Sequence, residues 1–328
     1  MHLNLNNAHI LVTGGAGFMG SAFIRFVLKQ ESFEGHLTNL DLLTYAGHLE
    51  NLESIQGDER YTFFHGDIQD EELLEKIQKE KPITAIVHFA AETHVDRSIT
   101  DPDTFIQTNI IGTYKLLEFV RKHPEIHFHH ISTDEVYGAL GKEGMFTEDS
   151  PYRPNSPYSA SKASSDHLVR SYGVTYKLST TLSHASNNYG PGQYPEKFIP
   201  LMIQRILEKK ELPIYGAGEN IREWLFVEDH ARAVWTILQH GKKGEVYNIG
   251  GGNEMKNIDL LHLLFEVMEE ITGEKVDKGL ITYVADRPGH DFRYAMDGAK
   301  VEQLGYRPIW PLKAGIRETI RSMKKVCV

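Results

Sequence analysis

The sequence has 328 residues, which is enough for one large domain or for two intimately joined domains. Hydrophobic residues make up 41% and charged residues 24%, the balance of an ordinary globular protein, and no apolar run is long enough to span a membrane. A formal net charge of -10 argues against broad nucleic-acid binding, because attraction to phosphates needs a basic face.

Two further features bear on location and chemistry. The first residues, MHLNLNNAHILVTGG, lack a basic region followed by a long apolar core, so we expect a cytoplasmic protein with no membrane partner. The only cysteine, Cys327, excludes an internal disulfide and argues against a cysteine nucleophile. Redox chemistry would therefore need a bound cofactor.

The first half of the chain alternates short apolar strands with amphipathic helices. Residues 8–30 read as a strand, a glycine-rich turn and a helix, and HLTNLD follows as a second strand. The alternation continues through YTFFHGDI, the charged helix DEELLEKIQKE, ITAIVHFA, DTFIQTNIIGTYKLLEFVRK and IHFHHIS. This rhythm predicts an α/β fold with a Rossmann-type doubly wound parallel sheet covered by helices.

After about residue 185 the alternation gives way to loops rich in proline and glycine, such as NNYGPGQYPEKFIP, PIYGAG and ADRPGH. We interpret this region as a smaller, irregular α/β substrate domain that closes over the first. The expected Rossmann domain comprises residues 1–185 and about 221–240. The expected substrate domain comprises about 186–220 and 241–328.

The glycine-rich turn TGGAGFMG indicates a dinucleotide site. Gly14, Gly17 and Gly20 recur every third residue between strand and helix, where the backbone must approach a pyrophosphate closely and the helix N-terminus favours the anion. Asp41 ends the next strand, about 20 residues after Gly20, where a ribose-binding acid is expected. An acid there repels a 2′-phosphate, so the pattern favours NAD over NADP.

Two residues of SPYSASKASSDHLVR are spaced for proton chemistry. Tyr158 and Lys162 are four residues apart on a predicted helix, so their side chains share one face. A tyrosine becomes a useful base near neutral pH when a neighbouring cation stabilises its phenolate. The pair alone is common by chance, but together with the nucleotide turn it indicates a catalytic site.

The stretch STDEVYG places two adjacent carboxylates, Asp134 and Glu135, behind Thr133 at the end of an apolar strand. Neighbouring acids repel each other and resist removal from water, so a purely structural role does not explain them.

With these motifs the sequence resembles the extended short-chain dehydrogenase/reductases, and within them the dTDP-glucose 4,6-dehydratases. The resemblance covers essentially the whole chain. It rests on TGGAGFMGS, HGDI, FAAETHVDRSI, STDEVYG, YSASKASSDHLVR, SNNYGP, PEKFIPL, YNIGGGNE and ADRPGHDFRYA. In that family the residues matching Thr133, Asp134 and Glu135 read TDE, whereas epimerases carry small hydroxyl residues there and decarboxylases carry TSE.

The resemblance implies a reaction and a role for each of these residues. Tyr158 and Lys162 serve the oxidation of the sugar at carbon 4 by NAD. Thr133 hydrogen-bonds the 4-hydroxyl, Asp134 protonates the departing 6-hydroxyl, and Glu135 removes the proton from carbon 5. Hydride then returns to carbon 6, so dTDP-glucose becomes dTDP-4-keto-6-deoxyglucose without net redox change.

The resemblance also implies binding residues and an assembly. The cofactor residues are Gly14, Gly17, Phe18, Met19, Gly20, Asp41, Asp67, Ile68, Ala90, Tyr158 and Lys162. The substrate residues are Thr93, Asn187, Lys197, Tyr215, Arg222, Asn257, Arg287 and His290. A homodimer is expected through helices at about 101–122 and 157–171, which carry Ile106, Ile110, Leu117, Leu168 and Val169.

Three departures from the family pattern leave the nucleotide open. Glu223 stands where the family has Asp, Phe292 replaces a frequent Arg, and SHASNNYG differs from SRCSNNYG. Dehydratases of UDP-glucose or of another NDP-glucose, a sugar-nucleotide epimerase or decarboxylase, and a non-catalytic NAD-binding scaffold remain alternatives.

The histidines of HFHH do not indicate a metal site. His127 and His129 alternate along a strand, and no acid at ligand spacing completes a site with His130. We interpret them as structural side chains and expect no metal.

Overall fold

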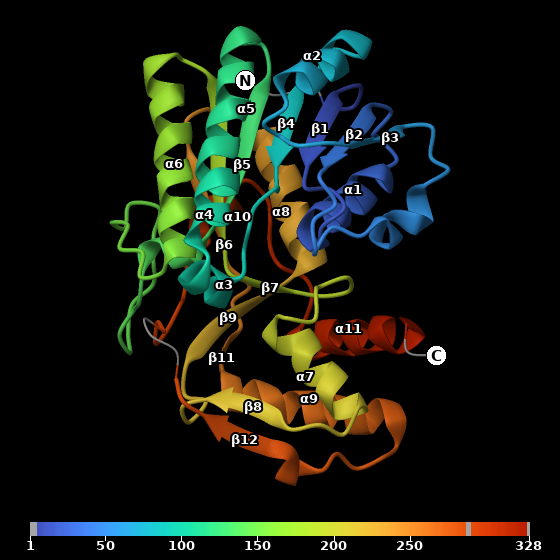
Figure 1. Ribbon diagram of the computed structural model, residues 1–328, viewed down its shortest axis with the longest axis vertical. Coiled ribbons are helices and arrows are strands. Elements are labelled where there is room, and N and C mark those ends of the chain that lie inside the picture. The colour runs from blue at the N-terminus through green and yellow to red at the C-terminus, as the bar shows by residue number, and fades with distance from the viewer. Residues whose placement is uncertain (1–4, 287–289, 327–328) are drawn as a thin grey trace.

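A seven-stranded parallel sheet forms the upper part of the molecule in Figure 1. The computed structural model describes residues 5–286 and 290–326. The strands lie in the order β10 (Val246–Ile249), β6 (Ser179–Ala185), β5 (His127–Thr133), β4 (Ala85–His88), β1 (His9–Thr13), β2 (His36–Asp41) and β3 (Tyr61–His65). All neighbouring pairs are parallel, as the alternation of strands and helices predicted.

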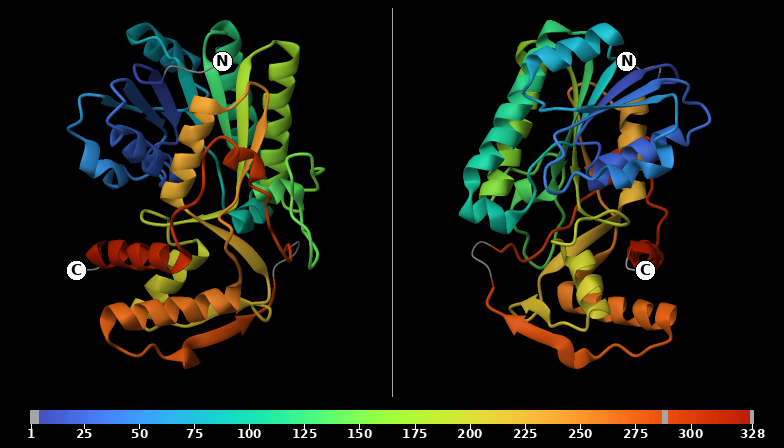
Figure 2. Two further views of the ribbon diagram at one scale, coloured as in Figure 1. Left: turned by 180° about the vertical axis from the view of Figure 1, so that it is seen from behind. Right: turned by 45° about the vertical axis from the view of Figure 1, so that its right-hand side comes forward.

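The helices of this part cover both faces of the sheet (Figures 1 and 2). One face carries α2 (Glu71–Glu80), α5 (Thr113–Lys122) and α6 (Pro157–Thr175), and the other carries α1 (Phe18–Leu28) and α8 (Val227–His240). Strand β1 contributes to both cores, because Ile10 and Val12 pack toward α1 and α8 whereas Leu11 packs toward α2 and α5. The doubly wound α/β prediction is therefore confirmed.

Short helical segments connect these elements. They are η1 (Leu49–Ile55), α3 (Val95–Thr100), α4 (Pro102–Phe105), the π-helical η2 (Ile106–Gly112), η3 (Asp134–Tyr137), η4 (Lys278–Leu280) and α10 (Ala299–Glu302). The single helix predicted over 103–122 is thus divided into α4, η2 and α5. Among the described residues, no helix combines the length and the apolar character that crossing a membrane requires.

The lower part in Figure 1 has its own core of apolar side chains. Its helices are α7 (Phe198–Leu207), α9 (Asn257–Thr272) and α11 (Leu312–Val326). Strands β8 (Leu212–Tyr215) and β12 (Ile281–Val284) pair at its outer edge. Between the two parts, β7 (Asn187–Tyr189), β9 (Ile221–Phe226) and β11 (Glu254–Lys256) form a three-stranded sheet.

Two elements cross the domain boundaries that the sequence predicted. Strand β10 lies in the range 241–328 but pairs with β6 in the large sheet, while β9 lies in the range 221–240 but belongs to the small central sheet. Both strands are short and follow loops, so their sequences do not reveal which sheet they join. Arg287 and Cys327 lie outside the described residues.

The apolar residues that the sequence predicted for dimer contacts lie in η2, α5 and α6, and only some of them are exposed. Ile106 is 43% exposed, but Leu117 and Val169 are almost fully buried in the core beneath the two helices. These two residues cannot contact a partner subunit. The apolar positions of a helix show that one face is buried, but they do not reveal whether that face packs against a sheet of the same chain or against another chain.

Candidate active site

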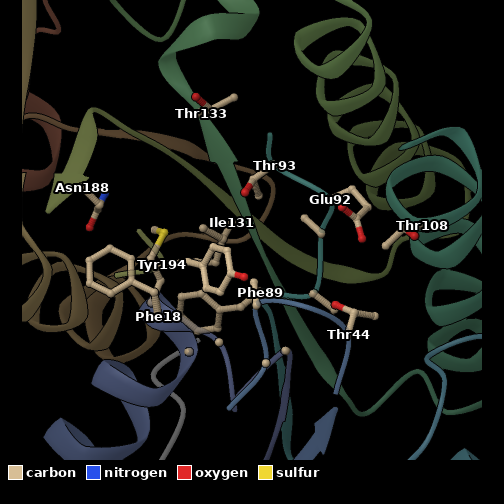
Figure 3. Close-up of a pocket in the computed structure, with 18 of the residues that line it drawn as sticks. Phe18, Thr44, Phe89, Glu92, Thr93, Thr108, Ile131, Thr133, Asn188 and Tyr194 are labelled. Atoms are coloured by element: carbon tan, nitrogen blue, oxygen red, sulfur yellow. The ribbon is translucent and has the colours of Figure 1, made fainter. Parts of the chain in front are cut away.

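A cavity of about 320 Å³ opens at the carboxyl ends of β1, β2, β4 and β5. Ligands of open α/β sheets bind at this edge, because the loops that leave parallel strands meet there. Figure 3 shows the labelled lining residues, with Thr133 at the end of β5, Phe18 at the start of α1, and Asn188 in β7 of the small central sheet. The cavity therefore lies where the two parts of the molecule meet.

The glycine-rich turn gives the cavity a wall made of bare backbone. Gly14 has a φ of +71°, and a Cβ atom there would lie 2.6 Å from the amide nitrogen of Ala90. A Cβ on Gly20 would lie 2.3 Å from the carbonyl oxygen of Gly14, so the first turn of α1 could not pack so closely on β1. Gly17 is the N-cap residue of α1, and it lines the cavity, so the N-terminus of this helix lies at the cavity wall.

Asp41 is fixed at the end of β2 by two backbone amides. Its carboxylate accepts hydrogen bonds from the amides of Ala16 and Leu43, both at 2.8 Å. Each carboxylate oxygen can still accept another hydrogen bond, so Asp41 can receive ribose hydroxyls without moving. Phe18, Met19, Asp67, Ile68 and Ala90 line the same cavity, so the structure brings every sequence-predicted cofactor residue together.

Asp134 and Glu135 begin η3 directly after β5 and line the cavity with Thr133. The Thr133 hydroxyl donates to Asp134 Oδ1 at 3.1 Å. Asp134 Oδ2 is buried and has no hydrogen-bond partner among the described residues. Burial, followed by the charges of Glu135 and Glu223, raises the pKa of Asp134 well above its usual range. Burial and the neighbouring carboxylates therefore favour the protonated form of Asp134, which can act as an acid.

Tyr158 and Lys162 lie in the first two turns of α6. The helix begins after Ser156, whose side chain caps the amide of Ser159 in a capping box, so the position of these turns is fixed locally. Lys162 Nζ donates to the carbonyl oxygen of Ile131 at 2.8 Å, and burial lowers its pKa to about 8.

The acidity of Tyr158 differs from the simplest expectation for a tyrosine beside a lysine. Burial first, and then the charge of Glu135, raise the pKa of the phenol well above 10, while a hydrogen bond with Thr133 opposes the rise. The enclosed cavity therefore favours the protonated phenol, and a positive charge or a hydrogen-bond donor placed beside Tyr158 would lower its pKa.

The predicted substrate residues fall into two groups. Thr93, Asn187 and Lys197 line the cavity, and Lys197 Nζ donates to the carbonyl oxygen of Thr93 at 2.7 Å. The other described substrate residues lie outside this lining: Arg222 in β9 of the small central sheet, Asn257 at the start of α9, Tyr215 at the end of β8, and His290 after β12. Arg222 donates to the carbonyl oxygen of Asp291 at 2.9 Å, and the rings of Tyr215 and His290 are 5.9 Å apart. Arg287 lies outside the described residues.

One part of the site has no clear sequence signal. The ring of Tyr194, after β7, stacks on His48 and meets Tyr45 edge-on, and both partners lie in the loop after β2. The Tyr45 hydroxyl donates to Glu196, and the Arg97 guanidinium lies 3.8 Å from the centre of the Tyr45 ring. We call these five residues the ring clasp. It joins the two parts of the molecule beside the cavity, where Figure 3 shows Tyr194 near Phe18.

The histidines of β5 are engaged by hydroxyl groups of β6. The ring nitrogens of His127 meet Ser179 and Thr181 at 2.9 Å, and those of His129 meet Thr181 and Ser183 at 2.8 and 3.2 Å. This cross-strand pairing accounts for them as structural side chains.

The fold and the site together define an extended short-chain dehydrogenase/reductase: a doubly wound sheet, a glycine-rich turn, and a tyrosine and lysine four residues apart beside one cavity. The family model described as GDP-mannose 4,6 dehydratase matches residues 11–319. A dTDP-glucose 4,6-dehydratase of Shigella flexneri is 51% identical, with 95% of this chain and 91% of the relative covered. One from Neisseria meningitidis is 50% identical, with 95% and 92% covered.

Solved structures agree with the sequence relatives. The dTDP-glucose 4,6-dehydratase of Streptomyces venezuelae has a TM-score of 0.91 and 44% identity, with 97% of each chain covered. That of Bacillus anthracis has a TM-score of 0.88 and 46% identity at the same coverage. Both were solved with NAD bound. The chain belongs to the dTDP-glucose 4,6-dehydratase family.

Proposed function

We propose that this chain converts dTDP-glucose into dTDP-4-keto-6-deoxyglucose with NAD as a retained cofactor. The observation that carries the proposal is the arrangement of Thr133, Asp134 and Glu135 beside Tyr158 in one cavity. An epimerase or a hydride-transferring dehydrogenase needs the tyrosine and the lysine, but it has no use for a buried acid and a second carboxylate next to it.

The residues of the cavity fit NAD. Gly14 and Gly20 allow the turn to pack tightly against the backbone of Ala90 and of Gly14 itself, and this packing leaves Gly17 and the N-terminus of α1 at the cavity wall for a pyrophosphate. Asp41 offers acceptors for the ribose, and Lys162 reaches the cavity from α6. When bound, NAD supplies an acceptor that takes a hydride and returns it within one cycle. The chain's own task in the oxidation is to remove the proton of the 4-hydroxyl, which we assign to Tyr158 with Thr133 as its hydrogen-bond partner.

The elimination of water needs one group that gives a proton and one that accepts it. Asp134 has the raised pKa of an acid, and we assign to it the protonation of the departing 6-hydroxyl. Glu135 is assigned the removal of the proton from carbon 5, which the ketone at carbon 4 makes acidic. The adjacent charges support this division, because each carboxylate makes it harder for the other to ionise.

The family relationship and the described surface support a homodimer as the working assembly. Ile99, Ile106 and Tyr114 are 44%, 43% and 38% exposed on α3, η2 and α5. Burial of these side chains against a second copy would remove apolar surface from water. Sedimentation at micromolar concentration should show a dimer, and a monomer would contradict this assignment.

The deciding experiment is a turnover screen of dTDP-, UDP-, CDP- and GDP-glucose with product mass as the readout. The proposal predicts loss of one water from dTDP-glucose and slower conversion of the others. Conversion of UDP-glucose as the preferred substrate would correct the nucleotide. A product of unchanged mass would identify an epimerase, and no product from any sugar nucleotide would reject the enzymatic assignment.

A further inference from the structure

A buried polar cluster lies behind Lys162, on the side away from the reacting sugar. Its centre is Asp166, one turn after Lys162 on α6 and only 2% exposed. The Ser132 hydroxyl donates to Asp166 Oδ2 at 2.9 Å, and His184 Nε2 lies 3.1 Å from the same oxygen. A carboxylate buried so deeply needs compensation, yet none of the roles assigned above uses it.

His130 connects this carboxylate to Lys162. His130 Nε2 lies 3.4 Å from Asp166 Oδ1 and 3.3 Å from Lys162 Nζ. One ring nitrogen can either donate its proton to the carboxylate or accept a proton from the ammonium group, but it cannot do both. His130 Nδ1 has no hydrogen-bond partner among the described residues. Both interactions, and a contact with the Ser165 hydroxyl at 3.1 Å, therefore use the same atom. Lys162 and Asp166 are thus linked through one nitrogen.

The charges around Lys162 single out Asp166. Three titratable groups interact with the charge of Lys162: His88 from β4, His130 from β5 and Asp166 from α6 itself. Asp134, Glu135 and Tyr158 line the same cavity, and His184 from β6 contacts Asp166. Burial lowers the pKa of Lys162, and the charge of Asp166 raises it. Burial acts to raise the pKa of Asp166, but the contacts with His130 and His184 outweigh burial and hold that pKa far below its usual range, so Asp166 remains an anion.

We propose that Asp166 is a positioning residue that keeps Lys162 protonated in its buried place and thereby sets the upper pH limit of turnover. The inference rests on the proposed function, in which a cationic Lys162 supports the loss of the Tyr158 proton. Without the carboxylate, the ammonium group would be enclosed by the protein with no buried anion behind it, and it would release its proton at lower pH.

His184 is one of the positions where this chain departs from the pattern of the family that it resembles. The family pattern SRCSNNYG has an arginine at this position, whereas this chain has a histidine. A guanidinium group is permanently charged and would neutralise Asp166 from the other side. A histidine carries a charge only when it is protonated, which leaves the carboxylate available to Lys162. The two ring nitrogens of His184 also form hydrogen bonds with the hydroxyl groups of Tyr137 and Tyr152, so the ring is held in place.

The test measures kcat of the cofactor-loaded enzyme on dTDP-glucose across the alkaline limb of its pH profile. The change Asp166→Asn preserves the size of the side chain and removes its charge. We expect the alkaline midpoint to fall by at least one pH unit, which is about a tenfold lower rate above both midpoints. Ser165→Ala is the matched control, because it removes a neighbouring hydroxyl, which contacts His130 at 3.1 Å, but keeps the carboxylate. Its midpoint should not move.

Thermal unfolding of the same proteins gives a readout independent of turnover. Folded Lys162, with its lowered pKa, binds fewer protons than the unfolded chain, so its contribution to stability rises with pH through the folded pKa. Asp166→Asn lowers that pKa further. The Tm deficit of the variant should therefore shrink as the pH rises from 7 to 9, while the deficit of Ser165→Ala should stay constant.

A second variant tests the charge if Asp166→Asn does not fold. His184→Arg introduces the residue of the family pattern and should lower the alkaline midpoint in the same direction. An unchanged midpoint in His184→Arg or in a folded Asp166→Asn would overturn the inference, as would an equal shift in Ser165→Ala. If the parent enzyme itself does not turn over dTDP-glucose, the proposed function fails, and the Tm comparison then decides whether Asp166 controls the charge of Lys162.

Discussion

The buried side chain of His230 allows a quantitative test of how burial makes the stability of this protein depend on pH. The side chain lies on α8 with no exposed surface, and its ring centre is 6.2 Å from that of Phe89. Neither ring nitrogen has a hydrogen-bond partner among the described residues. Burial alone lowers the pKa of His230 from 6.5 to about 3. The folded protein therefore excludes a proton that the unfolded chain binds readily.

The sign and size of the effect follow from proton linkage. Below pH 6.5 the unfolded state binds more protons than the folded state, so the free energy of unfolding falls as the pH falls toward 3. At pH 5 the unfolded chain gains about 2 kcal/mol from protonating this histidine, and at pH 8 it gains almost nothing. Replacing His230 with Leu removes this pH-dependent contribution. Any change in packing affects the free energy of unfolding equally at both pH values and cancels in the comparison.

The assay is urea unfolding of His230→Leu and of the parent at pH 8 and pH 5, followed by tryptophan fluorescence. Relative to the parent, the variant should gain about 2 kcal/mol of unfolding free energy between pH 8 and pH 5. His262→Leu, which replaces an exposed histidine of α9, is the matched control and should give a smaller difference. A pH-independent difference for His230→Leu would show that the buried ring is not the source of acid sensitivity.

Four further predictions concern the cavity. Tyr158→Phe should keep sugar-nucleotide binding in calorimetry, because the ring's packing survives, but kcat should fall by about 10²–10⁴. In the Asp134→Asn, Glu135→Gln double variant, mass spectrometry should detect a 4-keto-glucose nucleotide with no 6-deoxy product, and normal product formation would contradict the division of roles. Gly14→Ala should reduce copurified NAD, since its Cβ would meet the Ala90 backbone. Tyr194→Ala should accelerate loss of NAD during dialysis, with a spectrum of the retained cofactor as the measure.

The features that the sequence predicted correctly depend mostly on residues close together in the chain. The glycine turn and Asp41 follow one another within a single strand–turn–helix–strand unit, so their spacing fixes their geometry, and the structure brings them to one cavity. The strands and helices of the large sheet could also be predicted, because parallel strands covered on both faces carry continuous apolar runs, as Ile10, Leu11 and Val12 do in β1.

What the sequence could not show depends on contacts between distant segments or on burial. Tyr45 and Glu196 of the ring clasp are 151 positions apart, and nothing in either loop indicates the other. The buried positions of Leu117 and Val169 follow from which neighbour covers each helix face. The raised pKa of Tyr158 likewise depends on enclosure by several segments, which spacing along α6 does not reveal.

The ring clasp has a consequence for metabolism. A cofactor that is oxidised again at the end of every catalytic cycle has no chemical need to exchange, and Tyr194, which lines its cavity, is held by ring contacts with His48 and Tyr45. We expect an enzyme built in this way not to draw on the cell's supply of oxidised nicotinamide. Its flux should follow the concentration of the sugar nucleotide and stay constant when respiration or fermentation changes the cellular ratio of NAD to NADH.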